Sequence, residues 1–364
     1  MSLSIDITAL PDDRVFFTPS PLAELSSMLH VLAEPAHHPG LHGWAASTAA
    51  SLAPELSERL SEADFLWRSS RADFLVPGRP GATLAEELDA VDRIDDELYV
   101  RAASFMTCGT SRLSERRDSP LSDPVAQERA RELAMARGPR QAAFADRLFA
   151  DPPAVRALLR RLLEDCGEAF FAAAWRRVLP DLAADARHKA DRLARHGLGS
   201  ALAAVSSSIA LEERADGRRR IVIDKLQDSA TRSDAGGVTF VPTAFGHPHL
   251  LVVHEPGWRP VVQYPIAEGG LPEPVSLAVV QQRLEALAHP VRLRLARTMA
   301  RGPHTTGELA AAWQLSAPEV SRHLAVLRRA GLLTTRRRGR YMLYQLDLAG
   351  SARLGSDLLE AVLR

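Results

Sequence analysis

Cysteine, lysine and long apolar runs are scarce in this chain of 364 residues. Two cysteines, Cys108 and Cys166, are too few for a disulfide framework, so we expect a reducing compartment. We favour buried, inert thiols over redox sensors at both positions. No apolar run reaches the roughly 18 residues that a membrane-spanning helix needs. The first residues lack the basic start and apolar core of a signal peptide. The sequence therefore predicts a cytoplasmic protein without a membrane segment.

The charge of the chain is balanced overall but unevenly distributed. Residues 277–364 contain 14 arginines, no lysine and six acidic residues, a net charge of +8, so residues 1–276 carry −8. Coding bias explains why arginine replaces lysine, since only Lys189 and Lys225 are lysines, but it does not explain opposite signs in two segments. A basic segment attached to an acidic body indicates contact with a polyanion.

Residues 1–266 read as mainly helical with a smaller β portion, an α+β fold class. Residues 2–10 alternate apolar and polar side chains, as a strand does. Helical spacing then dominates from Ser20 to about Leu211, and short β-type runs between about Arg218 and Ile266 predict one small sheet. Two leucine-rich stripes at helical spacing are interpreted as core positions: Leu22, Leu25, Leu29 and Leu32, and Leu148, Val155, Leu158, Leu159, Leu162 and Leu163.

A stretch rich in glycine and proline, residues 267–276, is interpreted as a linker between two domains. Beyond it the helix signals are unusually consistent. Residues 277–287 form one predicted helix, and His289 caps a second that begins at Pro290 and runs to about Ala300. Residues 305–308 (TTGE) and 316–319 (SAPE) are two capping boxes, which open helices separated by a tight turn. This pattern predicts a helix-turn-helix.

The second of these helices divides into two faces. Val320, Leu324 and Leu327 are spaced to pack inward, whereas Ser321 and Arg322 lie outward with Ala317 and Ala325 near the N-terminal end. Small and polar side chains at that place suit a helix that reads base edges in the major groove. Arg328 and Arg329 follow nearer the DNA backbone.

A short basic hairpin follows this helix. Residues 332–337 form one predicted strand, Arg338 and Gly339 turn, and residues 340–346 return. A hairpin in this position is a wing, whose arginines reach phosphates or the minor groove. The predicted DNA-binding residues are Thr305, Thr306, Ser316, Ala317, Pro318, Ser321, Arg322, His323, Arg328, Arg337, Arg338 and Arg340.

The stretch from Leu287 to Leu346, LAHPVRLRL…YMLYQL, resembles the winged helix of the ArsR-type (arsenical-resistance repressor) regulators. The resemblance is carried by an A-x-P-x-R-L-x-L start, the segment VSRHLAVLRRAGL and an R-x-G-R-x-x-x-Y wing. It implies a homodimer with the first and last helices of the module, residues 277–287 and about 352–363, at the interface. It also implies an operator with two half-sites one or two helical turns apart.

The resemblance to metal-sensing members of that family would place cysteine ligands in the helix before the recognition helix, or Asp and His ligands in the last helix. Here the first of these helices, GELAAAWQL, contains no cysteine, and residues 347–364 contain neither histidine nor cysteine. We therefore assign no metal site and no cofactor to the winged helix. The layout of the preceding region, with SPLAELSSMLHVLAEPAHHPGLHGW and VPTAFGHPHLLVV, resembles a group of actinobacterial ArsR-like regulators whose N-terminal domain is uncharacterised. This second resemblance adds architecture but no ligand.

Three residue groups in the N-terminal region are candidates for a metal-binding or catalytic site. One histidine group comprises His30, His37, His38 and His42, and a second comprises His247, His249 and His254. Neither spacing matches a strong zinc pattern, so we favour capping or hydrogen-bonding histidines over metal ligands. An acidic group of Asp92, Asp95, Asp96 and Glu97 is interpreted as a solvated helix face rather than a catalytic site.

The sequence contains no enzyme motif. A nucleophile elbow, a phosphate-binding loop and a dinucleotide fingerprint are missing, and GLGSA at residues 197–201 is interpreted as a helix stop. We therefore expect no catalytic residue and not an enzyme, but a homodimeric transcriptional repressor that binds an operator in double-stranded DNA. Its N-terminal region is expected to sense a small-molecule effector or to support dimerisation. The alternatives are a docking scaffold built on the winged helix and an N-terminal enzyme fused to a DNA-binding domain.

Overall fold

The computed structural model describes residues 2–108, 119–224, 229–233, 236–266, 275–338 and 341–363. The chain divides into two compact units, Met1–Gly270 and Leu271–Arg364. Residues 267–274 of the predicted linker lie outside the described residues. Within the described ranges, none of the helices combines the length and the apolar character that crossing a membrane requires.

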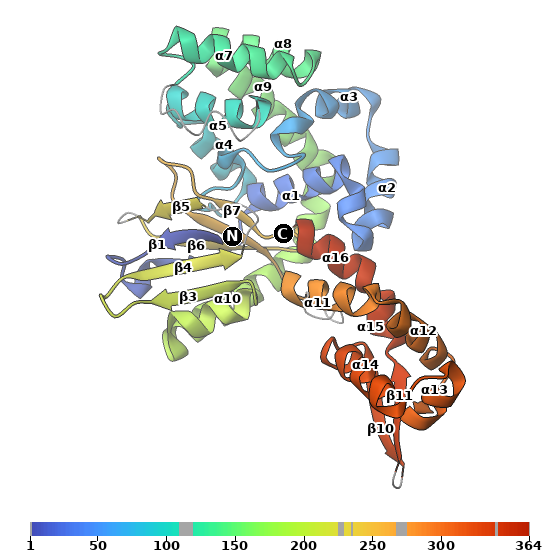
Figure 1. Ribbon diagram of the computed structural model, residues 1–364. Helices are drawn as coiled ribbons and strands as arrows, with labels where there is room; N and C mark the ends of the chain where they lie inside the picture. Colours follow the sequence, from blue (N-terminus) through green and yellow to red (C-terminus); the bar gives the residue numbers. More distant parts are fainter. Residues whose placement is uncertain are drawn as a thin grey trace. The chain divides into compact units, whose positions relative to one another are not determined.

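The helices of the first unit occupy the region where the sequence predicts them, between Ser20 and β3 (Ile209–Glu213) (Figure 1). Local signals set their starts. Ser20 accepts a hydrogen bond from the Ala23 backbone N–H, and Asp151 accepts one from that of Ala154, each ahead of a proline in the first turn. The helices are α1 (Pro21–Ala33), α2 (His42–Ser51), α3 (Pro54–Ala63), α4 (Leu84–Asp92), α5 (Asp96–Cys108), α7 (Pro124–Met135), α8 (Pro139–Ala150), α9 (Pro152–Cys166) and α10 (Ala172–Val205).

The β portion forms two four-stranded sheets where the sequence predicted one. The prediction was wrong because strands from the start of the chain pair with strands that follow the whole helical region, a relation that local pattern does not reveal. The first sheet has the order β3-β4-β1-β5 and the second β2-β6-β8-β7. The remaining strands are β1 (Ser2–Asp6), β2 (Val15–Phe17), β4 (Arg219–Asp224), β5 (Ser229–Arg232), β6 (Val238–Thr243), β7 (Leu251–Val253) and β8 (Val261–Pro265).

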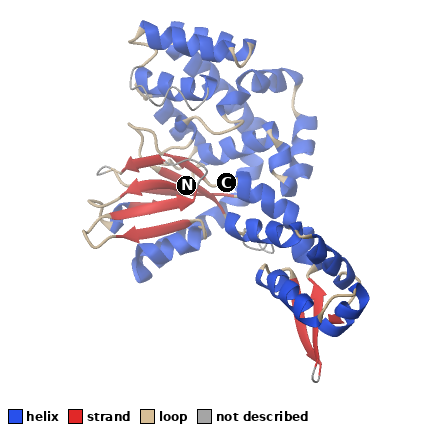
Figure 2. Cartoon of the chain, in the orientation of Figure 1, coloured by secondary structure: helices blue, strands red, loops and turns tan. Residues whose placement is uncertain are grey.

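Strand β1 holds an inner position, antiparallel to β4 and parallel to β5, and Ile5 pairs with Ile221. Strand β6 lies between β2 and β8, parallel to both, and all six of its residues are buried. Both sheets contribute to one core with the end of α10, where Leu198 and Leu202 are fully or almost fully buried. Figure 2 shows the strands of this unit gathered apart from most of its helices.

The helices enclose a separate core. Their structure tests three interpretations of the sequence. Cys108 and Cys166 are buried free thiols, and burial raises the pKa of each to about 12, as expected for inert cysteines. Leu158 is 49% exposed and is not the core position that its spacing predicted, because it lines a pocket that is open to solvent. Gly197, near the end of α10, has φ 77° and interrupts the helix, which agrees with a stop at this place.

The acidic group is more than a solvated face. Asp96 pairs with Arg156 at 2.6 Å, and Asp92 pairs with Arg160, which also binds Asp89 at 2.8 Å. These carboxylates therefore tie α4 and α5 to α9 through ion pairs.

The second unit has its own core, formed by residues such as Leu295, Leu309 and Leu324. A three-stranded sheet of order β10-β11-β9 accompanies its helices. Its elements are α11 (Leu277–Ala288), α12 (Pro290–Met299), β9 (His304–Thr305), α13 (Thr306–Trp313), α14 (Ala317–Arg329), β10 (Leu333–Arg338), β11 (Tyr341–Leu346), α15 (Leu348–Ala352) and α16 (Leu354–Leu363).

Candidate nucleic-acid interface and neighbouring sites

Helix α13 starts with the capping box that the sequence predicts. The Thr305 hydroxyl accepts a hydrogen bond from the Glu308 N–H, and the Glu308 carboxylate accepts one from the Thr305 N–H at 2.7 Å. These bonds lower the pKa of Glu308, which stays ionised beside the positive end of the helix. At the other end, the Trp313 indole N–H donates to the Thr298 hydroxyl at 3.0 Å, which fixes α13 against α12.

The turn between α13 and α14 is tight. Gln314 adopts the left-handed conformation, with φ 54° and ψ 42°, and α14 begins three residues later. Ser316 caps α14 by accepting a hydrogen bond from the Glu319 N–H, which is one half of the predicted box. Beyond the helix, Gly331 has φ 67°, the conformation that a C-terminal glycine supplies. The two helices and their turn form a helix-turn-helix.

The two predicted faces of α14 are confirmed by burial. Val320, Leu324 and Leu327 are at most 1% exposed. Ser321 and Arg322 are exposed on the other side, and Ala325, predicted on the same face, is half-buried. Four further predicted contact residues are exposed as well; these are Ser316, Ala317, Pro318 and Arg328. The start of α14 therefore presents small and polar side chains to solvent, the property that major-groove reading requires.

Three predicted contact residues are less accessible. Thr305 and Thr306 are half-buried at the start of α13. His323 is half-buried on α14, with its ring centroid 4.9 Å from that of His289, and burial lowers its pKa. The imidazole thus packs beside the cap of α12 as an uncharged group. Its contact with DNA stays a prediction.

The predicted hairpin is present, from Leu333 paired with Leu346 to Arg338 paired with Tyr341. Strand β11 also pairs with β9, which anchors the hairpin next to α13. Every residue from Thr334 to Arg338 is exposed. The hairpin extends beyond α13 and α14 in Figure 1, so three consecutive arginines, Arg336–Arg338, line its outer half. Arg340 lies outside the described residues.

Helices α11 and α16 are joined by a buried ion pair. Arg283 donates to Asp357 at 2.6 Å, and Arg353 lies 3.6 Å from the other carboxylate oxygen. The same helices carry exposed apolar side chains, which are Leu277, Leu284, Leu359 and Val362.

The first unit contains a histidine cluster that the sequence reasoning missed. His30, His38 and His249 bring their ligand atoms within 4.8 Å of one another, and the His37 ring centroid lies 5.6 Å from that of His249. The two histidine groups are separate in the sequence, and no local signal connects them because His249 lies 219 residues after His30. By contrast, His42 is exposed at the start of α2.

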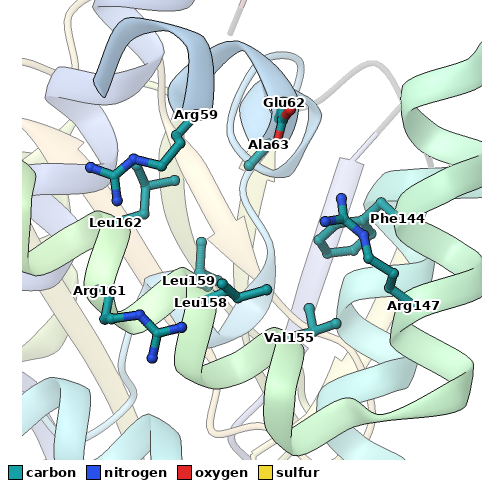
Figure 3. A pocket seen from close by; sticks show the side chains of 10 residues that line it. All are labelled: Arg59, Glu62, Ala63, Phe144, Arg147, Val155, Leu158, Leu159, Arg161 and Leu162. Atoms are coloured by element: carbon teal, nitrogen blue, oxygen red, sulfur yellow. The ribbon is translucent and has the colours of Figure 1, made fainter. Parts of the chain in front are cut away.

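A pocket opens between α3, α8 and α9. Its floor is apolar, with Phe144, Val155 and Leu159 among its residues, and the exposed Leu158 belongs to it. Exposed arginines from all three helices stand around this floor (Figure 3). They are Arg59, which pairs with Asp165 at 2.5 Å, and Arg147 and Arg161.

A capped helix-turn-helix followed by an arginine-rich β-hairpin defines the second unit as a winged-helix DNA-binding module. A helix-turn-helix domain model matches residues 287–336, and the model of a family of unknown function (DUF5937) matches residues 1–270. The chain belongs to the DUF5937 family. It carries an ArsR-type helix-turn-helix domain C-terminal to the region that matches this family.

Named relatives match a domain-sized part of the chain. A biofilm growth-associated repressor of Agrobacterium fabrum is 45% identical over 71 residues, 20% of this chain and 61% of the relative's length. The HTH-type transcriptional regulator Rv2034 of Mycobacterium tuberculosis is 43% identical over 74 residues, 20% of this chain and 69% of the relative. The crystal structure of the transcriptional repressor BigR from Xylella fastidiosa is 38% identical with a TM-score of 0.20, covering 22% of this chain and 81% of that one.

Proposed function

We propose that the protein is a homodimeric transcriptional repressor that binds operator DNA through α14 and the β10–β11 hairpin. The observation that carries this proposal is the exposure of Ser321 and Arg322 at the start of α14 beside the exposed arginines of the hairpin. Residues 277–364, which hold both elements, have a net charge of +8. Base contacts from α14 supply sequence selectivity, whereas arginine contacts with phosphates supply affinity that falls with salt.

Dimerisation uses α11 and α16 in this proposal. The Arg283–Asp357 pair holds the two helices together, and Leu284 and Leu359 expose 41% and 49% of their surface. A second copy that covers these side chains removes apolar area from water and spaces two copies of α14 for two half-sites.

The N-terminal unit modulates binding through a small effector in the pocket between α3, α8 and α9. Its apolar floor and the arginines at its rim suit a molecule with an apolar body and a carboxylate or other anionic group. A coupling of about 1–3 kcal/mol between effector and operator changes DNA affinity roughly 5- to 150-fold. The proposed compartment is the cytoplasm, and the proposed role requires no catalysis.

The test is binding of the purified full-length protein to fluorescent duplex DNA from its own upstream region, titrated across salt. The Arg338→Ala/Arg340→Ala double variant is measured beside Arg177→Ala, which changes an exposed arginine of α10 in the other unit. Selective binding with a steep salt dependence, flattened in the double variant alone, supports the proposal. Absence of selective binding by an intact dimer contradicts it and favours the docking-scaffold alternative.

The N-terminal enzyme alternative is separable from this test. Screening the full-length protein for hydrolysis of generic esters and phosphoesters addresses it directly. Turnover that survives disruption of the helix-turn-helix would assign the first unit a catalytic role.

A further inference from the structure

Three imidazoles from three separate segments converge in the first unit. His30 lies on α1, His38 lies in the connection between α1 and α2, and His249 lies in the connection between β6 and β7. The ring centroids of His30 and His38 are 5.0 Å apart, and each lies 4.9 Å from that of His249. His30 and His38 are 3% and 1% exposed, whereas His249 is half-buried. The cluster therefore lies just beneath the surface.

Two backbone carbonyls orient the buried rings. His30 Nδ1 lies 2.9 Å from the Trp67 carbonyl oxygen, and His38 Nδ1 lies 2.5 Å from that of His247. A carbonyl oxygen only accepts hydrogen bonds, so each Nδ1 carries the proton and each Nε2 presents a lone pair. A hydrogen bond from the distal ring nitrogen to a carbonyl is the usual support of a metal-ligating histidine.

Two buried ring nitrogens, one in the cluster and one in the adjacent His37, have no hydrogen-bond partner within the part of the chain that the structure describes. The Nε2 atom of His38 is buried and has no hydrogen-bond partner among the described residues, and the same is true of Nδ1 of the neighbouring His37. An unsatisfied buried nitrogen costs free energy that an added ligand recovers. Where several imidazole lone pairs converge, a cation is the group that accepts them.

The spacing of the nitrogens fits a tetrahedral metal. His30 Nε2 and His249 Nε2 are 3.2 Å apart. Two imidazole nitrogens at about 2.0–2.1 Å from one tetrahedral zinc ion are about 3.3 Å apart. The ligand atoms of the three histidines all lie within 4.8 Å of one another, and binding of one ion requires the wider of these separations to close to about 3.3 Å.

We propose that His30, His38 and His249 bind a single divalent transition-metal ion of the Zn²⁺ class. Each histidine coordinates through Nε2, and His37 or a water molecule takes the fourth position. The donor set indicates the class of metal. Neutral imidazoles without thiolates suit zinc and the neighbouring late transition metals, whereas calcium and magnesium prefer oxygen ligands.

The protonation of the rings is compatible with this role. Burial lowers the pKa of His30 to about 2 and that of His38 to about 4, so both rings are neutral at physiological pH. In the hydrogen-bonded arrangement, His249 Nε2–H donates to the lone pair of His30 Nε2. Metal binding requires that proton to move from Nε2 to Nδ1 of His249, a change of tautomer that leaves the ring neutral.

One nearby charge opposes a dication. Arg71 is buried, and its positive charge contributes to the low pKa of both His30 and His38. The buried carboxyl of Glu24 interacts with Arg71 in the opposite sense. Burial raises the pKa of Glu24 to about 7, and a bound dication favours its ionised form.

The test uses the full-length protein, stripped with a chelator and titrated with Zn²⁺ and then with Co²⁺. The ligand variants are His38→Ala and His249→Asn, and the matched control is His42→Ala, an exposed histidine from the same stretch of sequence. We expect one Zn²⁺ per chain and a visible Co²⁺ spectrum of tetrahedral type. Loss of a ligand lowers affinity more than the 10- to 100-fold that loss of a supporting partner costs, whereas His42→Ala leaves it unchanged.

Circular dichroism of each variant separates loss of metal from loss of fold. Because His249 is half-buried in a connection, His249→Asn decides the question where His38→Ala does not fold. Equal Zn²⁺ affinity in His249→Asn and His42→Ala overturns the proposal, as does a wild-type protein that binds no Zn²⁺. Neither result bears on DNA binding by the second unit.

Discussion

Arg283 on α11 donates a hydrogen bond to Asp357 on α16 at 2.6 Å, and the Asp357 side chain is only 3% exposed. Replacing Asp357 with Ala leaves the Arg283 guanidinium largely buried without its main partner. We expect a loss of about 3–5 kcal/mol in the stability of the second unit, measured by denaturant unfolding. The control is Asp191→Ala, which removes an exposed pair with Arg195 and costs less than about 1 kcal/mol. Equal losses of unfolding free energy in the two variants would show that the buried pair stabilises the protein no more than the exposed pair does.

The proposed dimer predicts a second effect on the same helices. Leu284→Glu and Leu359→Glu place charges on the exposed apolar faces of α11 and α16. We expect light scattering to show monomers. We also expect a large loss of operator affinity, because two separate copies of the protein then bind the two half-sites independently. Val125→Glu, on α7 of the first unit, changes a still more exposed apolar residue and keeps the dimer. A dimer that persists in both the α11 and α16 variants would place the interface elsewhere.

Substitutions in the recognition helix and in the hairpin are expected to weaken DNA binding in different ways. Arg338→Ala removes a phosphate contact, so affinity falls on all sequences and the salt slope decreases by about 0.9. Arg322→Ala removes a base contact worth about 1–3 kcal/mol, so discrimination between operator and unrelated DNA falls as well. Binding titrations on both DNAs at several salt concentrations distinguish the two. Equal, salt-independent losses would argue against both assignments.

The helix cap of α14 predicts a loss of stability. Ser316 accepts the Glu319 N–H, and Ser316→Ala leaves that donor without its cap. We expect a cost of about 1 kcal/mol by thermal unfolding. Ser316→Asp, which retains an acceptor, should recover most of it. If Ser316→Asp is no better than Ser316→Ala, the cap does not determine the stability of this helix.

Local signals made the second unit readable from sequence. Capping residues act within three positions, so Thr305 and Ser316 predicted helix starts that the structure confirms. The hairpin was equally local, since its strands pair across one turn. The predicted base and phosphate contacts stay predictions.

Long-range relations in the first unit could not be read in this way. Spacing identified a helical stripe but did not show that Leu158 faces a pocket rather than the core. Likewise, alternation predicted strand β1 but not that Ile5 pairs with Ile221. The histidine cluster depends on the same kind of tertiary relation, because the connection that holds His249 is placed by β6 and β7.

The pairing of β1 and β2 with late strands has a consequence for synthesis on the ribosome. Strand β1 needs β4 and β5, so the first sheet closes only after Arg232 has been made, and β2 needs β6, which ends at Thr243. Until then the nascent chain holds its helices without their sheets. Strand β6 also pairs with β8, which ends at Pro265, so the second sheet closes only after nearly all of the first unit has been made.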